Sequence, residues 1–113
     1  MNLKTEQSGS VSIVRVGETR LTYPILGDFS STVSGLIASG QRRLLLDLSS
    51  VTYVDSATIG CFIDLFRQLH GVGGQLKLSG VQKRVETMLT LTGTHNFIEM
   101  YPDEPSAVKS FGV

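Results

Sequence analysis

An unbroken apolar run near the middle of the chain constrains the fold most strongly: Arg43-Leu-Leu-Leu-Asp-Leu48. Successive side chains of a strand point to opposite faces of a sheet, so consecutive leucines require that both faces are covered. Strands of this kind are typical of sheets flanked by helices, most often with parallel neighbours. The run therefore predicts an internal strand of an α/β protein.

The rest of the chain alternates between strand-like and helix-like patterns. β-Branched or alternating apolar residues predict strands at residues 3–6, 11–16, 20–23, 51–54, 75–79 and 97–101. Apolar stripes at helical spacing predict helices over residues 25–37, 59–69, 81–89 and 105–111. Pro24 suits the first turn of the first of these helices, and Gly40 suits its exit. This order predicts one domain over residues 1–113, a small mixed sheet of about four to five strands flanked by helices.

Composition and charge exclude several classes of function. The chain is 41% hydrophobic and 18% charged, which is typical of a globular protein. Ten basic residues balance ten acidic ones, so we expect no direct contact with nucleic acid. The first ten residues lack the apolar stretch of a signal peptide, and no apolar run approaches the roughly 20 residues that span a bilayer. We therefore expect a cytoplasmic protein that does not insert into a membrane.

The side chains that could carry catalysis or bind a metal are few. Cys61 is the single cysteine and lies in an apolar segment, which predicts a buried free thiol. His70 and His95 have no cysteine or carboxylate neighbours at metal-ligand spacing. No histidine accompanies a serine in a way that suggests a nucleophile and its base. We expect no enzymatic activity, no metal and no cofactor.

The most informative segment is LLLDLSSVTYVDSATIG, residues 44–60. It places Asp55 and Ser56 where the clearest helical stripe of the chain begins. A hydroxyl at that position is accessible, and the free N–H groups and dipole of a helix start favour negative charge. A phosphate on Ser56 would add about −1.5 to −2 charges at neutral pH. Such a site could change partner binding without unfolding the protein.

A simpler interpretation of the same two residues stays open. Aspartate or serine before a helix is an ordinary N-cap, which contributes about 1 kcal/mol to stability and carries no function. The two residues alone do not distinguish a cap from a phosphorylation site.

The wider pattern resembles the STAS domain family, whose founding members are bacterial anti-sigma factor antagonists. The resemblance runs from about Val11 to the last helix and is most specific at Asp47, Asp55-Ser56, Ile59-Gly60, Gly73-Gly74 and the segment over residues 85–93. It implies a small mixed sheet with helices on one side. In the antagonists, the serine after the aspartate accepts phosphate from an anti-sigma factor that is also a serine kinase, and a serine phosphatase resets the cycle. The resemblance thus implies that Ser56 is the phosphoacceptor and that Asp55, Ser56 and Ala57 face the partner.

Two positions depart from the family pattern. Thr58 stands where the family has a glycine, which changes the surface around the serine and offers a second hydroxyl to a kinase. The early stretch over residues 17–23 lacks the aspartate that the family carries after the leucine, here Leu21. Because that edge belongs to the docking surface of the antagonists, we include Thr22, Tyr23 and Thr58 among the expected partner-binding residues.

The sequence is compatible with three functions. The first is an anti-sigma factor antagonist that binds an anti-sigma serine kinase and is controlled by phosphorylation of Ser56. The second is a non-enzymatic accessory subunit of an ABC-type lipid transport complex, a role that STAS-like domains also have. The third, a sensor of nucleotides or other small molecules, has no recognisable ligand motif in its favour.

Overall fold

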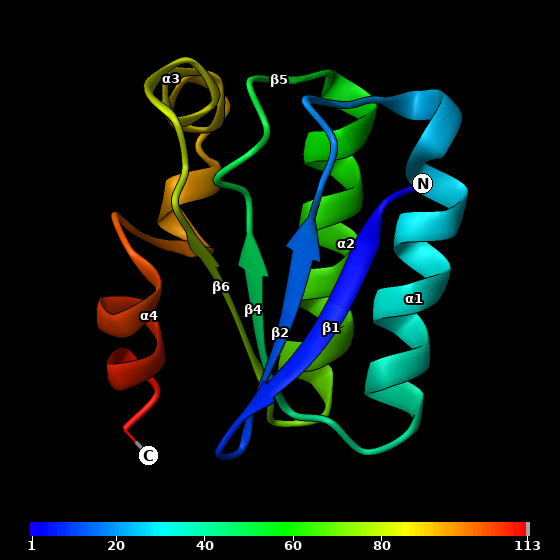
Figure 1. The fold of residues 1–113 in the computed structure, drawn as a ribbon, viewed down its shortest axis with the longest axis vertical. Helices are drawn as coiled ribbons and strands as arrows, with labels where there is room; N and C mark the ends of the chain where they lie inside the picture. Colours follow the sequence, from blue (N-terminus) through cyan, green and yellow to red (C-terminus); the bar gives the residue numbers. More distant parts are fainter. Residues whose placement is uncertain (113) are drawn as a thin grey trace.

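A computed structural model describes residues 1–112 of the chain (Figure 1). Five strands form one sheet in the order β1-β2-β4-β6-β7, with β1 antiparallel to β2 and all other neighbours parallel. The prediction of a mixed sheet flanked by helices is confirmed. The elements in chain order are β1 Leu3–Ser8, β2 Val11–Val16, β3 Arg20–Leu21, η1 Tyr23–Ile25, α1 Leu26–Ala38, β4 Arg43–Asp47, β5 Tyr53–Val54, α2 Ser56–Gly71, β6 Gln75–Ser79, α3 Lys83–Leu91, η2 Thr94–Asn96, β7 Glu99–Tyr101 and α4 Glu104–Ser110.

Both faces of β4 are covered, as its run of leucines predicts. Leu44 and Leu46 belong to the main core, which also contains the buried sides of α1, α2 and α3. Leu45 points to the other face and packs with Ala107 and Phe111 at the C-terminal end of the chain. All three leucines are fully buried.

The expectation that the helices lie on one side of the sheet is wrong for α4. This helix lies beside β6 and away from α1 and α2 (Figure 1). Its apolar side contacts Val11 and Ile13 of β2 as well as Leu45. These residues alternate with the main-core residues along their strands, so the sheet has a second apolar face that one short helix is enough to cover.

The first long helix begins slightly later than Pro24 suggests. Pro24 lies in the 3-10 turn η1, and α1 follows directly at Leu26. The helix ends at Ala38, and Gly40 then adopts a φ of +106°, a conformation that glycine reaches without a steric penalty. The prediction that Gly40 follows the end of this helix is therefore confirmed. α1 packs on α2 through the rings of Phe29 and Phe62, whose centroids are 5.9 Å apart.

One end of the sheet carries a second, two-stranded sheet and the starts of two helices (Figure 1). β3 and β5 form a small parallel pair in which Arg20 lies opposite Tyr53 and Leu21 opposite Val54. Both strands follow strands of the main sheet, and α2 and α3 begin at this same end (Figure 1). Within residues 1–112, no helix is both long enough and apolar enough to cross a membrane.

Candidate functional site

Ser56 is the first residue of α2, as the sequence predicts. Asp55 is the N-cap, with extended backbone angles, and Asp55 Oδ1 accepts a hydrogen bond of 2.9 Å from the Thr58 backbone N–H. Ser56 is exposed, and its hydroxyl makes no hydrogen bond within the described residues. The structure thus presents a free hydroxyl to solvent at a helix start, where negative charge is favoured.

Asp55 connects two segments that are distant in the sequence. Asp55 Oδ2 accepts a hydrogen bond of 2.9 Å from the Tyr23 backbone N–H, while Oδ1 binds the first turn of α2. Burial disfavours the ionised carboxylate, but the hydrogen bonds from the Thr58 hydroxyl and from the N–H groups of Tyr23 and Thr58 outweigh it. The pKa of Asp55 therefore lies below its ordinary value. This carboxylate fixes η1 against the start of α2.

The expectation that Thr58 faces a partner, or offers a second hydroxyl to a kinase, is wrong. Thr58 is fully buried. Its hydroxyl lies 2.7 Å from the Leu21 carbonyl oxygen and 2.7 Å from Asp55 Oδ1, both of which can accept its proton. The third residue of this helix turns inward toward β3, so the threonine replaces a glycine without changing the outer surface around Ser56.

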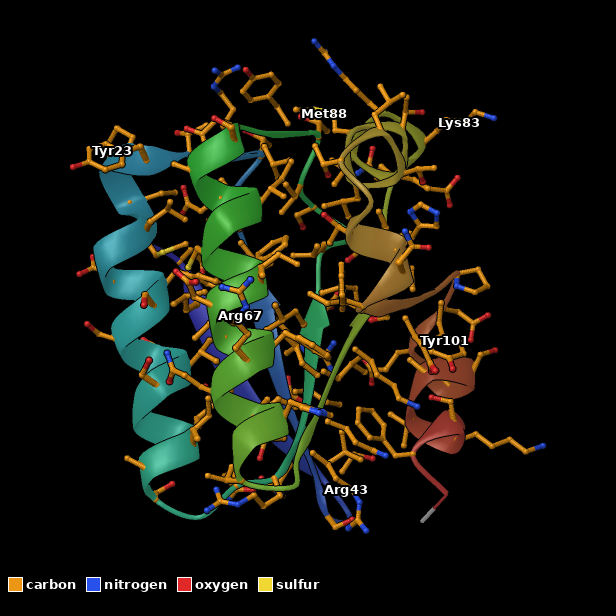
Figure 2. The ribbon with its side chains drawn as sticks, turned by 180° about the vertical axis from the view of Figure 1, so that it is seen from behind. Tyr23, Arg43, Arg67, Lys83, Met88 and Tyr101 are labelled. Carbon is orange, nitrogen blue, oxygen red and sulfur yellow. The ribbon has the colours of Figure 1, made fainter. Side chains whose placement is uncertain are left out.

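The other expected partner-binding residues lie on the same end of the molecule. Ala57 is exposed beside Ser56. Tyr23 is 73% exposed, and Figure 2 shows its side chain at the end of the molecule where α2 begins. Thr22 is half-buried and its side chain caps no helix. Asp55 is brought together with Tyr23 by a direct hydrogen bond.

A groove between α1 and α2 adjoins this surface, and sequence reasoning did not find it. It has a volume of about 670 Å³, and its walls include Tyr23, Ala57, Cys61, and the helical glycines Gly27 and Gly60. The sequence signal for it is the pair of glycines within apolar helical stripes, because each leaves the space of a missing side chain between facing helices. The expectation that Cys61 is buried needs correction: it is half-buried in this wall, and burial raises the pKa of its thiol.

A basic cluster around Tyr53 was also missed. The Arg20 guanidinium carbon lies 4.4 Å from the centre of the Tyr53 ring, and that of Arg84 lies 5.5 Å from it. Arg20 comes from β3 and Arg84 from the first turn of α3, so only the fold brings them together.

The histidines lie apart from this surface. His70, in the last turn of α2, stacks on Phe66 with ring centroids 5.6 Å apart. In the part of the chain that the structure describes, no three His, Cys, Asp or Glu side chains form a group that could hold a metal ion.

Comparison with known proteins identifies the family. Residues 2–107 match the family model of the STAS domain. The chain belongs to the STAS domain family.

Two curated proteins and one solved structure are similar to this STAS protein. A Staphylococcus aureus protein named anti-sigma-B factor antagonist is 22% identical over 100 residues, which cover 88% of this chain and 92% of that protein. A Thermotoga neapolitana protein, named as a candidate anti-sigma factor antagonist, is 31% identical over 62 residues, so the match spans only 55% of either chain. The structure of Bacillus SpoIIAA in its phosphorylated form has the same fold, with a TM-score of 0.75 and 16% identity over 97% of this chain and 99% of that one.

Proposed function

We propose that this STAS protein is an anti-sigma factor antagonist in a partner-switching pathway. In this proposal it binds an anti-sigma serine kinase while Ser56 is unmodified and releases the kinase when Ser56 carries a phosphate. A serine phosphatase restores the binding state. The protein acts by binding rather than by catalysis, in the cytoplasm where sigma factors work.

The observation that carries the proposal is the free, exposed hydroxyl of Ser56 at the start of α2. A kinase can reach this hydroxyl without any opening of the fold. The added charge of about −1.5 to −2 would lie beside the free N–H groups of a helix start, which favour it. Modification would therefore change the surface while the domain stays folded.

The surrounding residues support distinct roles in this surface. Ser56, Ala57 and Tyr23 are exposed and would contact the partner directly. Both oxygens of Asp55 accept hydrogen bonds from the protein itself, so Asp55 would act mainly by holding Tyr23 in place. Thr22 would lie at the edge of the contact. The names of the Staphylococcus and Thermotoga relatives, and the phosphorylated form of SpoIIAA, support the same function.

The test is a pull-down from native extract with wild type, Ser56→Ala and Ser56→Asp, with mass spectrometry of partners and phosphosites. We expect a serine kinase of the anti-sigma type to be retained by wild type and Ser56→Ala and lost with Ser56→Asp. Ser31→Asp is the matched control, because Ser31 is an exposed serine of α1. It should retain the kinase. Equal retention by all variants would contradict the proposal.

A stability measurement separates release from unfolding. Because the start of α2 favours negative charge, Ser56→Asp should change the free energy of unfolding by no more than about 0.5 to 1 kcal/mol, and in the stabilising direction. A large loss of stability would mean that the variant loses its partner by unfolding.

The accessory subunit of an ABC-type lipid transport complex remains the second candidate. It is motivated by the stretch over residues 17–23, which lacks the aspartate that the family carries after the leucine, here Leu21. Under this function, all Ser56 variants would retain one transport ATPase, and Ser56 from native cells would carry no phosphate.

A further inference from the structure

We propose that Arg20 and Arg84, which lie over the ring of Tyr53, form a docking surface for an acidic segment of a partner protein, and that phosphate on Ser56 weakens this docking. We call Arg20, Tyr53 and Arg84 the basic patch. The second half of the proposal rests on the proposed function, whereas the first half does not.

The patch is ordered before any partner arrives. The guanidinium carbons of Arg20 and Arg84 lie 4.4 and 5.5 Å from the centre of the Tyr53 ring, within the range of cation–π attraction. Arg20 is further fixed by its register opposite Tyr53 in the β3–β5 pair. Side chains held in this way lose less conformational entropy on binding than free surface arginines do.

The cations of the patch have no acidic partner in the part of the chain that the structure describes. Within residues 1–112, Arg20 and Arg84 form no ion pair. Arg84 occupies the first turn of α3, where the helix dipole disfavours positive charge. Glu86 follows in the same helix, but it lines a different hollow, with Met100 and Tyr101. The Tyr53 ring holds both guanidinium groups in place, but within residues 1–112 neither has a carboxylate partner, so both are available to bind one from another protein.

The chemistry of the patch fits carboxylates. Guanidinium groups bind carboxylates through paired hydrogen bonds, and an aromatic ring beneath them adds an apolar contact. Two cations on a chain whose formal net charge is zero do not form the long basic track that nucleic acid requires. The occupant we infer is a segment rich in Asp and Glu on a partner protein.

The patch adjoins Ser56. Tyr53, in β5, lies three residues before Ser56 in the sequence. In space, β5, the start of α2 and the start of α3 lie at one end of the molecule (Figure 1). Figure 2 shows Tyr23 at this same end of the molecule. The Asp55 carboxylate, next to Ser56 in the sequence, already accepts hydrogen bonds from N–H and hydroxyl donors. A phosphate on Ser56 would attract the arginines of the patch, repel the partner's carboxylates and compete with them for the same cations.

The first half is tested with a short glutamate-rich synthetic peptide, titrated into the isotopically labelled full chain and followed by NMR. We expect shifts centred on the side chains of Arg20, Tyr53 and Arg84, with affinity that falls between about 50 and about 300 mM salt. The double variant R20E/R84E should bind at least about tenfold more weakly, which corresponds to about 1.4 kcal/mol. R67E/K109E is the matched control, since Arg67 and Lys109 are exposed on other elements, and it should bind like wild type.

Three outcomes would overturn the docking surface. They are shifts centred on other cations, equal binding by both double variants, and tighter binding of a single-stranded oligonucleotide than of the peptide. Circular dichroism of R20E/R84E checks that the variant is folded, and R20Q/R84Q, which removes charge without reversing it, should give a smaller loss of affinity.

The second half is tested with Ser56→Asp in the same titration. We expect peptide affinity to fall about two- to fivefold, with Ser31→Asp unchanged. An unchanged affinity would refute the coupling to Ser56. The two experiments distinguish the two proposals. Failure of R20E/R84E to weaken peptide binding, with the kinase still retained by wild type and lost with Ser56→Asp, refutes the patch alone. The absence of any kinase in the pull-down, with normal peptide binding, refutes the proposed function alone.

Discussion

Asp55 shows how one short side chain can define a surface. One carboxylate oxygen caps the N-terminus of α2 by accepting a hydrogen bond from the Thr58 N–H, and the other accepts one from the Tyr23 N–H. Without this carboxylate, both N–H groups would need water as a partner, and η1 would lose its attachment to α2. The exposed neighbours Ser56 and Tyr23 owe their relative position to it.

Asp55→Ala should therefore destabilise the protein by about 1 to 3 kcal/mol, because it removes a helix cap and a second hydrogen bond together. Urea unfolding followed by circular dichroism measures this change. Asp64→Ala is the control, since Asp64 is exposed on the same helix and has no role in its cap. Equal stability of the two variants would contradict the assigned role of Asp55.

Thr58→Val tests whether the threonine holds the fold. Valine keeps the shape but leaves the Leu21 carbonyl oxygen without its side-chain donor, and we expect a loss of about 1 to 2 kcal/mol. Thr87→Val is the comparison, because Thr87 is an exposed helical threonine whose hydroxyl binds within its own helix. It should change stability by less than about 0.5 kcal/mol. In phosphorylation assays, Ser56→Ala should gain no phosphate at Thr58.

At the scale of elements, α4 closes the face of the sheet that the other helices leave open. Ala107 and Phe111 fill the apolar surface of β2 and β4. Around this contact, Arg15 of β2 binds Glu6, Asp47 and Glu104, which come from β1, β4 and α4. Hydrogen bonds from Arg15 to Glu104 and Glu6, and then to Asp47, raise the pKa of Arg15 above its ordinary value. One arginine thus joins four elements.

Phe111→Ala should lower the free energy of unfolding by about 3 kcal/mol, because it opens a cavity between α4 and the sheet. Amide hydrogen exchange should show faster exchange in α4 and unchanged protection around Ser56. Leu91→Ala provides the control, since Leu91 is 81% exposed. A loss of protection in the first turn of α2 as well would show that α4 and the Ser56 surface are coupled, contrary to this expectation.

At the scale of the whole molecule, acid should destabilise the fold. Burial opposes ionisation of Asp47, but hydrogen bonds from Ser49 and Arg15 outweigh it, so the pKa of Asp47 is lowered. The pKa of Asp55 is lowered as described, and the Tyr101 hydroxyl and Lys77 lower the pKa of Glu99. Each carboxylate therefore stabilises the folded state above its unfolded pKa and loses that contribution as pH falls through the folded pKa.

The urea midpoint should thus stay nearly constant from about pH 7 to about pH 5.5 and fall steadily below about pH 4.5. The double variant Asp47→Asn/Asp55→Asn should start from a lower midpoint and show a weaker dependence on acid. A dependence as steep as that of wild type would mean that other groups control acid unfolding.

The sequence by itself determined the elements and the placement of Ser56. The leucine run of β4 required cover on both faces, and the apolar stripe after Ser56 required a helix that begins there. Both are local patterns whose period fixes which side is buried. Even so, the family resemblance led to a wrong expectation for α4, because the second apolar face becomes evident only when alternate residues of β2 and β4 are aligned in register.

Only the tertiary structure decided what surrounds Ser56. Thr58 follows Ser56 by two positions yet turns inward, because a helix rotates about 100° per residue and β3 lies behind its first turn. Arg20 and Arg84 meet over one ring because a parallel pair and a helix start converge at the same end of the sheet. Contacts between residues so far apart in the chain leave no local pattern, since they arise from where the strands end rather than from the residues that flank them.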